Sequence, residues 1–153
     1  MIDFAKDVQI KWYGKEVMVA ATKANISAMK KSALVLERYI KISLSKPGMG
    51  RKYKRGKKTH RASSPMQVPA LDLGVLMSSV GSDVTQKGDK ILGEVGTDID
   101  AMMSHHQFAI GTDVNYGLYL ELGTVNMKPR PWLRPALKKN ETKINGIFAK
   151  ANS

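Results

Sequence analysis

Residues 108–137, FAIGTDVNYGLYLELGTVNMKPRPWLRPAL, hold two predicted helices joined by a stiff connector. A short apolar run opens the stretch, and Asp113 or Asn115 can cap the segment that follows it. That segment, Tyr116 to Leu122, is predicted to form two turns of helix. Gly123 stands just past its end, where a helix needs a residue with positive φ.

This short helix is apolar nearly all round, because Glu121 is its only charged residue. A helix of that composition must be buried on more than one side, and one so short needs tertiary contacts to form. One face can pack on its own domain, and a neighbouring subunit can cover the other. The alternative is a core helix of a monomer.

The connector, residues 128–131, cannot be helical, because two prolines alternate with Lys128 and Arg130. Trp132 and the residues after it start a last helix, which tolerates a proline in its first turn. Glu121 is close in sequence to two arginines, so we expect it to pair with Arg130 or Arg134, within the subunit or across the ring. The candidate interface residues are Tyr116, Tyr119, Leu120, Glu121, Arg130, Trp132 and Arg134.

Two sequence blocks carry a family resemblance. Residues 116–124 (YGLYLELGT) and 129–137 (PRPWLRPAL) form the first, and residues 59–65 (THRASSP) and 69–76 (PALDLGVL) form the second. Together they resemble the tail-completion proteins (head–tail joining, or neck, proteins) of long-tailed bacteriophages and prophages. The chain departs from the family pattern at two positions of the second block, Leu73 and Val75, which replace a threonine and an arginine.

The resemblance implies a structural virion protein that forms a ring, with six subunits expected, between the DNA-filled head and the tail tube. Its partners would be copies of itself, the head-completion or adaptor ring, and the tail terminator or tail tube. Non-specific contact with genomic DNA in the channel would add to these. The protein would reside in the virion, and in the host cytoplasm during assembly. A tail terminator or a head-completion ring protein is the alternative role.

Length and composition are those of one domain. The 153 residues, 42% of them hydrophobic, suffice for a single core, and the chain has no cysteine. The first residues contain acids and no long apolar run, so we expect neither a signal peptide nor a membrane span.

Periodicity predicts an α+β fold, a curled antiparallel sheet of about four strands packed against three helices. Apolar residues three and four apart, including Ile26, Met29, Ala33, Leu36 and Ile40, predict a long helix from Glu16 to Lys46, with Glu37 and Lys41 elsewhere on the wheel. A short helical turn is expected within residues 71–80, and Leu133, Leu137, Ile144 and Ile147 or Phe148 mark the last helix. The predicted strands are Val8–Trp12, about Val80–Thr85, about Lys90–Gly96 and about Gln107–Gly111.

The net charge of +12 is concentrated in part between the long helix and the sheet. Residues 47–70 are predicted to form an extended loop, rich in glycine and proline. Its basic positions, with one tyrosine among them, are Arg51, Lys52, Tyr53, Lys54, Arg55, Lys57, Lys58 and Arg61. Three interpretations stay open: a docking arm for an acidic protein ring, a surface for DNA phosphates, or a solvated loop. The DNA interpretation also leads to a second function, a small basic module that binds nucleic acid without sequence preference.

No pattern of catalytic residues is present. Ser63 and Ser64 lack a nucleophile elbow, no phosphate-binding glycine loop occurs, and His105 and His106 have no ligand-spaced partner. We therefore expect no enzyme activity, no metal and no cofactor.

Overall fold

The computed structural model describes residues 13–72, 74–97 and 116–153. Within them the chain is a mixed α and β structure with four helices and two separate two-stranded antiparallel sheets. The strands expected at Val8–Trp12 and Gln107–Gly111 lie outside the described residues, as do Leu73, His105 and His106.

The predicted long helix is confirmed as α1, Gly14–Leu44. Its buried positions, Ala28, Ser32, Ala33, Leu36, Ile40 and Leu44, follow the three-and-four spacing of an amphipathic helix. The helix ends two residues before Lys46, the expected last residue, and Pro47 soon follows. Proline lacks an N–H and disfavours helical geometry in the residue before it, so the chain must turn here.

The expected strands of the central hairpin are confirmed as β3, Val80–Lys87, and β4, Lys90–Thr97. They pair antiparallel around a two-residue turn, and the first turn residue, Gly88, has φ +60°. A positive φ at this position is what a tight hairpin turn needs, and glycine supplies it without strain. The short helix α2, Val75–Ser79, leads directly into β3 and confirms the helical turn expected within residues 71–80.

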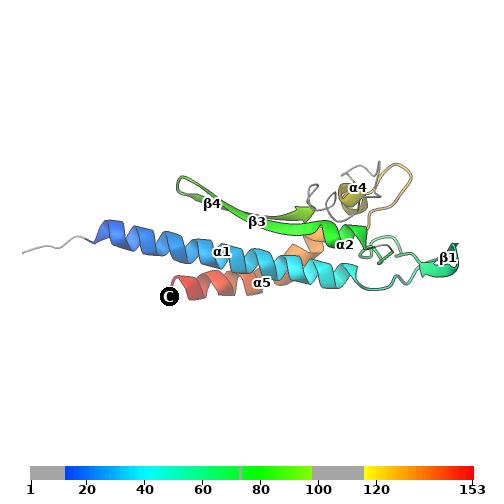
Figure 1. Ribbon diagram of the computed structural model, residues 1–153, viewed down its shortest axis with the longest axis horizontal. Coiled ribbons are helices and arrows are strands. Elements are labelled where there is room, and N and C mark those ends of the chain that lie inside the picture. Colours follow the sequence, from blue (N-terminus) through cyan, green and yellow to red (C-terminus); the bar gives the residue numbers. More distant parts are fainter. Residues whose placement is uncertain (1–12, 73, 98–115) are drawn as a thin grey trace, which may run out of the picture.

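Figure 1 shows α1 lying between the β3–β4 hairpin and the last helix, α5, Leu133–Ala151, which runs antiparallel to α1. The buried positions of α5 are Ala136 and Asn140, whereas Leu137 is exposed, so the predicted apolar stripe was wrong at that position. The buried Asn140 satisfies its amide by donating from Nδ2 to the carbonyl oxygen of Ala136, 2.8 Å away.

The core lies at the C-terminal half of α1, where α2, the short helix α4, Tyr116–Leu122, and the start of α5 converge (Figure 1). Its buried members are Leu36, Ile40, Leu44, Val80, Leu120, Trp132 and Ala136. The first turns of α1 extend past the hairpin in Figure 1, and Val17, Met18 and Val19 are exposed there.

The predicted extended loop at residues 47–70 was wrong in one respect, because a second hairpin lies within it. Strands β1, Lys52–Arg55, and β2, Lys58–Arg61, pair antiparallel around Gly56 and Lys57, and Gly56 has φ +59°. Seven of their eight residues are exposed. A strand with no buried face shows no apolar alternation, so periodicity does not reveal it.

Candidate functional site

The helix α4 has the boundaries that the sequence predicts, Tyr116 to Leu122. Gly123 follows with φ +79°, and its N–H donates to the carbonyl oxygen of Tyr119 at 2.8 Å, which closes the helix. A side chain on Gly123 would also meet the Met127 carbonyl oxygen at 2.8 Å and the nitrogen of Pro129 at 2.9 Å. Glycine is therefore needed here for both backbone conformation and space.

Glu121 holds the start of α5 through backbone groups. Its carboxylate accepts hydrogen bonds from the N–H groups of Trp132 at 2.6 Å, Leu133 at 2.9 Å and Arg134 at 3.0 Å. These N–H groups lie at a helix N-terminus, where intrahelical partners are missing and a negative charge is favoured. Trp132, the residue at the cap position, makes no such bond with its own side chain.

The predicted ion pair of Glu121 with Arg130 or Arg134 is not found among the described residues; the carboxylate meets Arg134 through the backbone alone. The physical reason is that both carboxylate oxygens already accept hydrogen bonds from backbone donors at a helix end. Arg130 instead donates its backbone N–H to the carbonyl oxygen of Leu120 at 2.7 Å, and its Nη1 lies 3.3 Å from Met127 Sδ. Arg130 Nε is buried without a hydrogen-bond partner in the described part of the chain.

Trp132 is buried, with 4% of its surface exposed, and its side chain contacts the backbone of α4. Its indole Nε1–H donates to the carbonyl oxygen of Gly117 at 3.0 Å. The ring packs so close to Gly117 that a side chain there would lie 3.3 Å from it. Glu121 thus joins the two helices through its side chain and the backbone at the start of α5, whereas Trp132 joins them through its side chain and the backbone of α4.

The outward face of α4 is apolar and exposed. Leu118 and Leu122 are each 52% exposed and Tyr119 is 45% exposed, whereas Leu120 is 3% exposed and packs into the core. We call Leu118, Tyr119 and Leu122 the α4 face.

The predicted interface residues thus separate into three groups by burial. Tyr119 and Arg134 are exposed, Arg130 and Glu121 are partly buried, and Leu120 and Trp132 are buried within their own protomer. The side chain of Tyr116 lies outside the described residues. Sequence reasoning left Leu118 and Leu122 out of the interface set. If Leu120 and Glu121 are known to face the protomer, the helical wheel places Leu118 and Leu122 on the outward side.

Asp72 contacts the basic hairpin β1–β2 through one residue of each strand. Arg55 Nη1 forms an ion pair with Asp72 Oδ2, and His60 Nδ1 lies 3.2 Å from Asp72 Oδ1. Tyr53 stacks on His60 across the strands, with ring centroids 5.8 Å apart. The pairing continues below the strands, where the N–H of Ala62 donates to the carbonyl oxygen of Arg51 at 3.0 Å.

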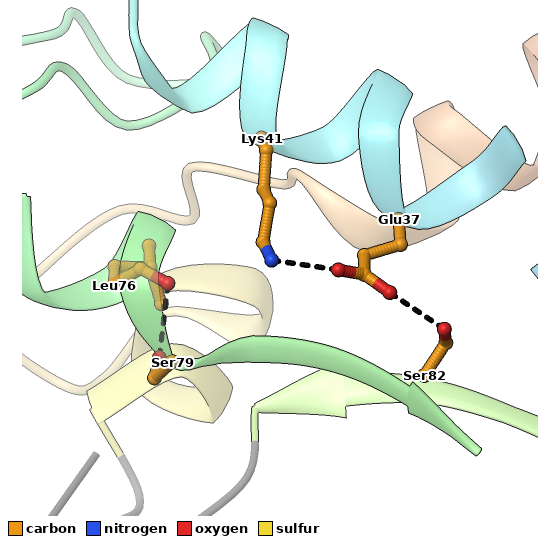
Figure 2. A network of polar contacts seen from close by, with 5 residues as sticks. All are labelled: Glu37, Lys41, Leu76, Ser79 and Ser82. Carbon is orange, nitrogen blue, oxygen red and sulfur yellow. Dashed lines mark hydrogen bonds and ion pairs between the residues drawn. The ribbon is translucent and has the colours of Figure 1, made fainter. Parts of the chain in front are cut away.

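A second cluster of polar side chains connects α1 to strand β3 (Figure 2). The carboxylate of Glu37 lies between Lys41 Nζ at 2.6 Å and the hydroxyl of Ser82 on β3, which donates to it at 2.6 Å. Burial, the largest single effect, raises the pKa of Glu37, but the hydrogen bonds from Lys41 and Ser82 and the Lys41 charge together outweigh it. The net result is a pKa below the ordinary value of 4.5.

No match is found among protein-family models, curated proteins or solved structures.

In the described residues, no three metal-ligating side chains come together. None of the helices described is both long and apolar enough to span a membrane. What the described residues do offer is two exposed surfaces of different chemistry, the apolar α4 face and the basic hairpin.

Proposed function

We propose that this protein is a structural subunit of a long-tailed phage or prophage virion. Copies of it form a ring at the head–tail junction, join the tail tube to the DNA-filled head and leave a channel for the DNA. The resemblance of residues 116–137 and 59–76 to tail-completion proteins is the starting point.

The exposure of the α4 face is the main structural support for the proposal. Leu118, Tyr119 and Leu122 are about half exposed on a helix whose Leu120 is buried in the protomer's own core. Contiguous apolar surface on a soluble protein marks an interaction site. A second copy of the chain covers this face in the proposed ring, where heterologous contacts repeat around a closed symmetry axis.

Arg130, in the connector that follows α4, is a further candidate for the subunit contact. Its Nε is buried without an acceptor among the described residues, and leaving such a donor unpaired costs about 1–3 kcal/mol. The residue as a whole is only partly buried, so its exposed atoms can contact a neighbouring subunit. Arginine is also among the residue types that dominate protein interfaces.

The two blocks that carry the resemblance lie together in the fold. The N–H of Met66 donates to the carbonyl oxygen of Pro129 at 2.8 Å, so the segment after the basic hairpin packs on the connector between α4 and α5.

The proposal includes a wider sheet than the β3–β4 hairpin alone. The segments Val8–Trp12 and Gln107–Gly111 have strand periodicity and would extend this hairpin to a curled antiparallel sheet of about four strands. Both segments lie outside the described residues.

Two measurements test the proposal. The mass of the purified protein, alone and with isolated tails, should be a multiple of the 16.9 kDa protomer mass. Inactivating the gene in the phage or prophage that encodes it should yield DNA-filled heads and finished tails that stay separate in electron micrographs. Normally joined particles from the inactivated phage would overturn the proposal.

A further inference from the structure

The register of the basic hairpin divides its side chains between two faces. Tyr53 pairs with His60 and Arg55 with Lys58, whereas Lys52 pairs with Arg61 and Lys54 with Thr59. Successive side chains of a strand point to opposite sides, and directly paired residues point to the same side. We call Lys52, Lys54, Thr59 and Arg61 the outer face of the hairpin.

The opposite face is the one that Asp72 holds. Arg55 and His60, both on this face, form the two contacts with the Asp72 carboxylate. The Tyr53–His60 stack lies on the same side. The alternation therefore directs the outer face away from Asp72, and every one of its residues is exposed.

Three of the four outer-face residues are cations, and no ion pair to any of them occurs in the described part of the chain. Lys52 and Lys54 are two residues apart on one strand, about 6.7 Å at the usual rise of a strand, and Arg61 stands across from Lys52. Lys57 adds a further exposed cation at the turn. The result is an unneutralised positive surface on a narrow two-stranded ribbon at one end of the molecule (Figure 1).

We infer that the outer face of the β1–β2 hairpin binds the phosphate backbone of double-stranded DNA. The major groove of DNA admits a two-stranded β-ribbon, and closely spaced cations on such a ribbon can reach the phosphates beside it. Contacts to phosphates position the ribbon without selecting a sequence, so we expect this binding to be non-specific.

An acidic protein surface fits the outer face less well. Protein interfaces are centred on aromatic and aliphatic anchors and are depleted in lysine, and the outer face contains no apolar side chain. The hairpin is also ordered by its own strand pairing and by Asp72, so no partner is needed to fold it.

The inference does not depend on ring formation, because the hairpin and Asp72 belong to one protomer. DNA binding and assembly can therefore succeed or fail separately. In the proposed ring the same surface would contact the DNA that passes through the junction.

The test is a salt titration of binding to a short fluorescent DNA duplex, measured by anisotropy. The outer-face variant combines Lys52→Gln, Lys54→Gln and Arg61→Gln. The control variant combines Lys138→Gln, Lys139→Gln and Lys143→Gln, three exposed lysines on α5, and so loses the same net charge. Because each neutralised phosphate contributes about 0.9 to the slope of log affinity against log salt, the outer-face variant should lose about 2–3 from that slope and at least about tenfold in affinity.

The control variant should keep most of the wild-type slope and affinity. Equal losses in the two variants, or none in the outer-face variant, would overturn the inference. The single variants Lys52→Gln and Lys54→Gln, each expected to lower the slope by about 0.9, serve if the triple variant does not fold. Labelled polyglutamate is the second probe: tighter binding to it than to a duplex of equal charge would assign the hairpin to an acidic protein and overturn the DNA assignment.

Discussion

The carboxylate of Glu121, in the last turn of α4, lies 2.6 Å from the backbone nitrogen of Trp132, where α5 begins. The indole of Trp132 in turn donates to the Gly117 carbonyl oxygen on α4. Trp132 therefore donates both hydrogen bonds, one from its backbone N–H to a side chain of α4 and one from its indole to the backbone of α4. This explains why an acid, a glycine and a tryptophan are needed at these positions, and it leaves Leu118 and Leu122 free to face outward.

Removing the Glu121 carboxylate should destabilise the protein. We expect Glu121→Gln to lower the unfolding free energy by about 1–2 kcal/mol, and Glu121→Ala by about 2–4 kcal/mol, because three backbone donors lose their charged acceptor. Urea unfolding followed by circular dichroism gives both values. Glu141→Gln, at an exposed position of α5, is the control and should change stability by less than about 0.5 kcal/mol. An effect of Glu121→Ala no larger than the control would show that the cap contributes nothing.

Two helical glycines should respond to alanine with opposite signs. At Gly117 a Cβ would lie 3.2 Å from Thr97 Cγ2, 3.3 Å from the Trp132 ring and 3.4 Å from Leu76 Cδ1. Gly117→Ala should therefore cost about 1–2 kcal/mol, since the packed neighbours must shift. At Gly146, on α5, a Cβ would meet nothing within 4 Å, so Gly146→Ala should stabilise by about 0.5–1 kcal/mol. Melting temperatures that move in the same direction for both variants would contradict this.

The sequence predicts the elements whose signals are local. The bounds of α4 match the prediction because a glycine follows the last turn and a proline-rich connector comes next. The long helix and the β3–β4 hairpin were likewise predictable from periodicity and a glycine-containing turn.

The errors concern contacts between elements. Glu37 was placed on the helical wheel away from the apolar stripe, and the sequence did not show that Ser82, distant in sequence, donates a hydrogen bond to its carboxylate. Glu121 was expected to pair with an arginine, whereas the folded chain offers it a helix N-terminus. The β1–β2 hairpin was missed because its alternating faces are both polar. Each of these depends on which segments meet, and local pattern does not contain that information.

Acid should weaken the contact between α1 and β3. The pKa of Glu37 is lowered in the folded protein, so its ionised form stabilises the fold at pH values above the unfolded pKa, near 4.5. This contribution is lost as the pH falls through the lower, folded pKa. Wild-type stability should therefore fall more steeply than that of Glu37→Gln as the pH is reduced below about 4.5. Urea unfolding at a series of pH values measures the difference. Glu94→Gln, exposed on β4, is the control and should retain the wild-type pH dependence.

Asp72 should stabilise the basic hairpin against local opening. Asp72→Asn removes the charge that pairs with Arg55 and faces His60, so the hairpin should open more often. We expect faster trypsin cleavage within residues 51–61, with the global unfolding free energy changed by less than about 1 kcal/mol, because the pair with Arg55 is largely exposed. Asp83→Asn, at an exposed position of β3, is the control. Equal cleavage rates in the two variants would show that Asp72 does not anchor the hairpin.

The α4 face should control self-association. Leu118, Leu122 and the control position Leu137 on α5 are each 52% exposed. Replacing any of them by lysine therefore removes a similar amount of buried apolar surface from the protomer. In the proposed ring, Leu118→Lys and Leu122→Lys each bury a lysine charge in the subunit contact. Burying a charge without an oppositely charged partner is strongly unfavourable. Both should shift the mass toward the 16.9 kDa protomer and keep the wild-type melting temperature of the protomer. Leu137→Lys should assemble as the wild type does. Wild-type assembly by both α4 variants would remove α4 from the interface, whereas dissociation of all three would point to a general effect of added charge.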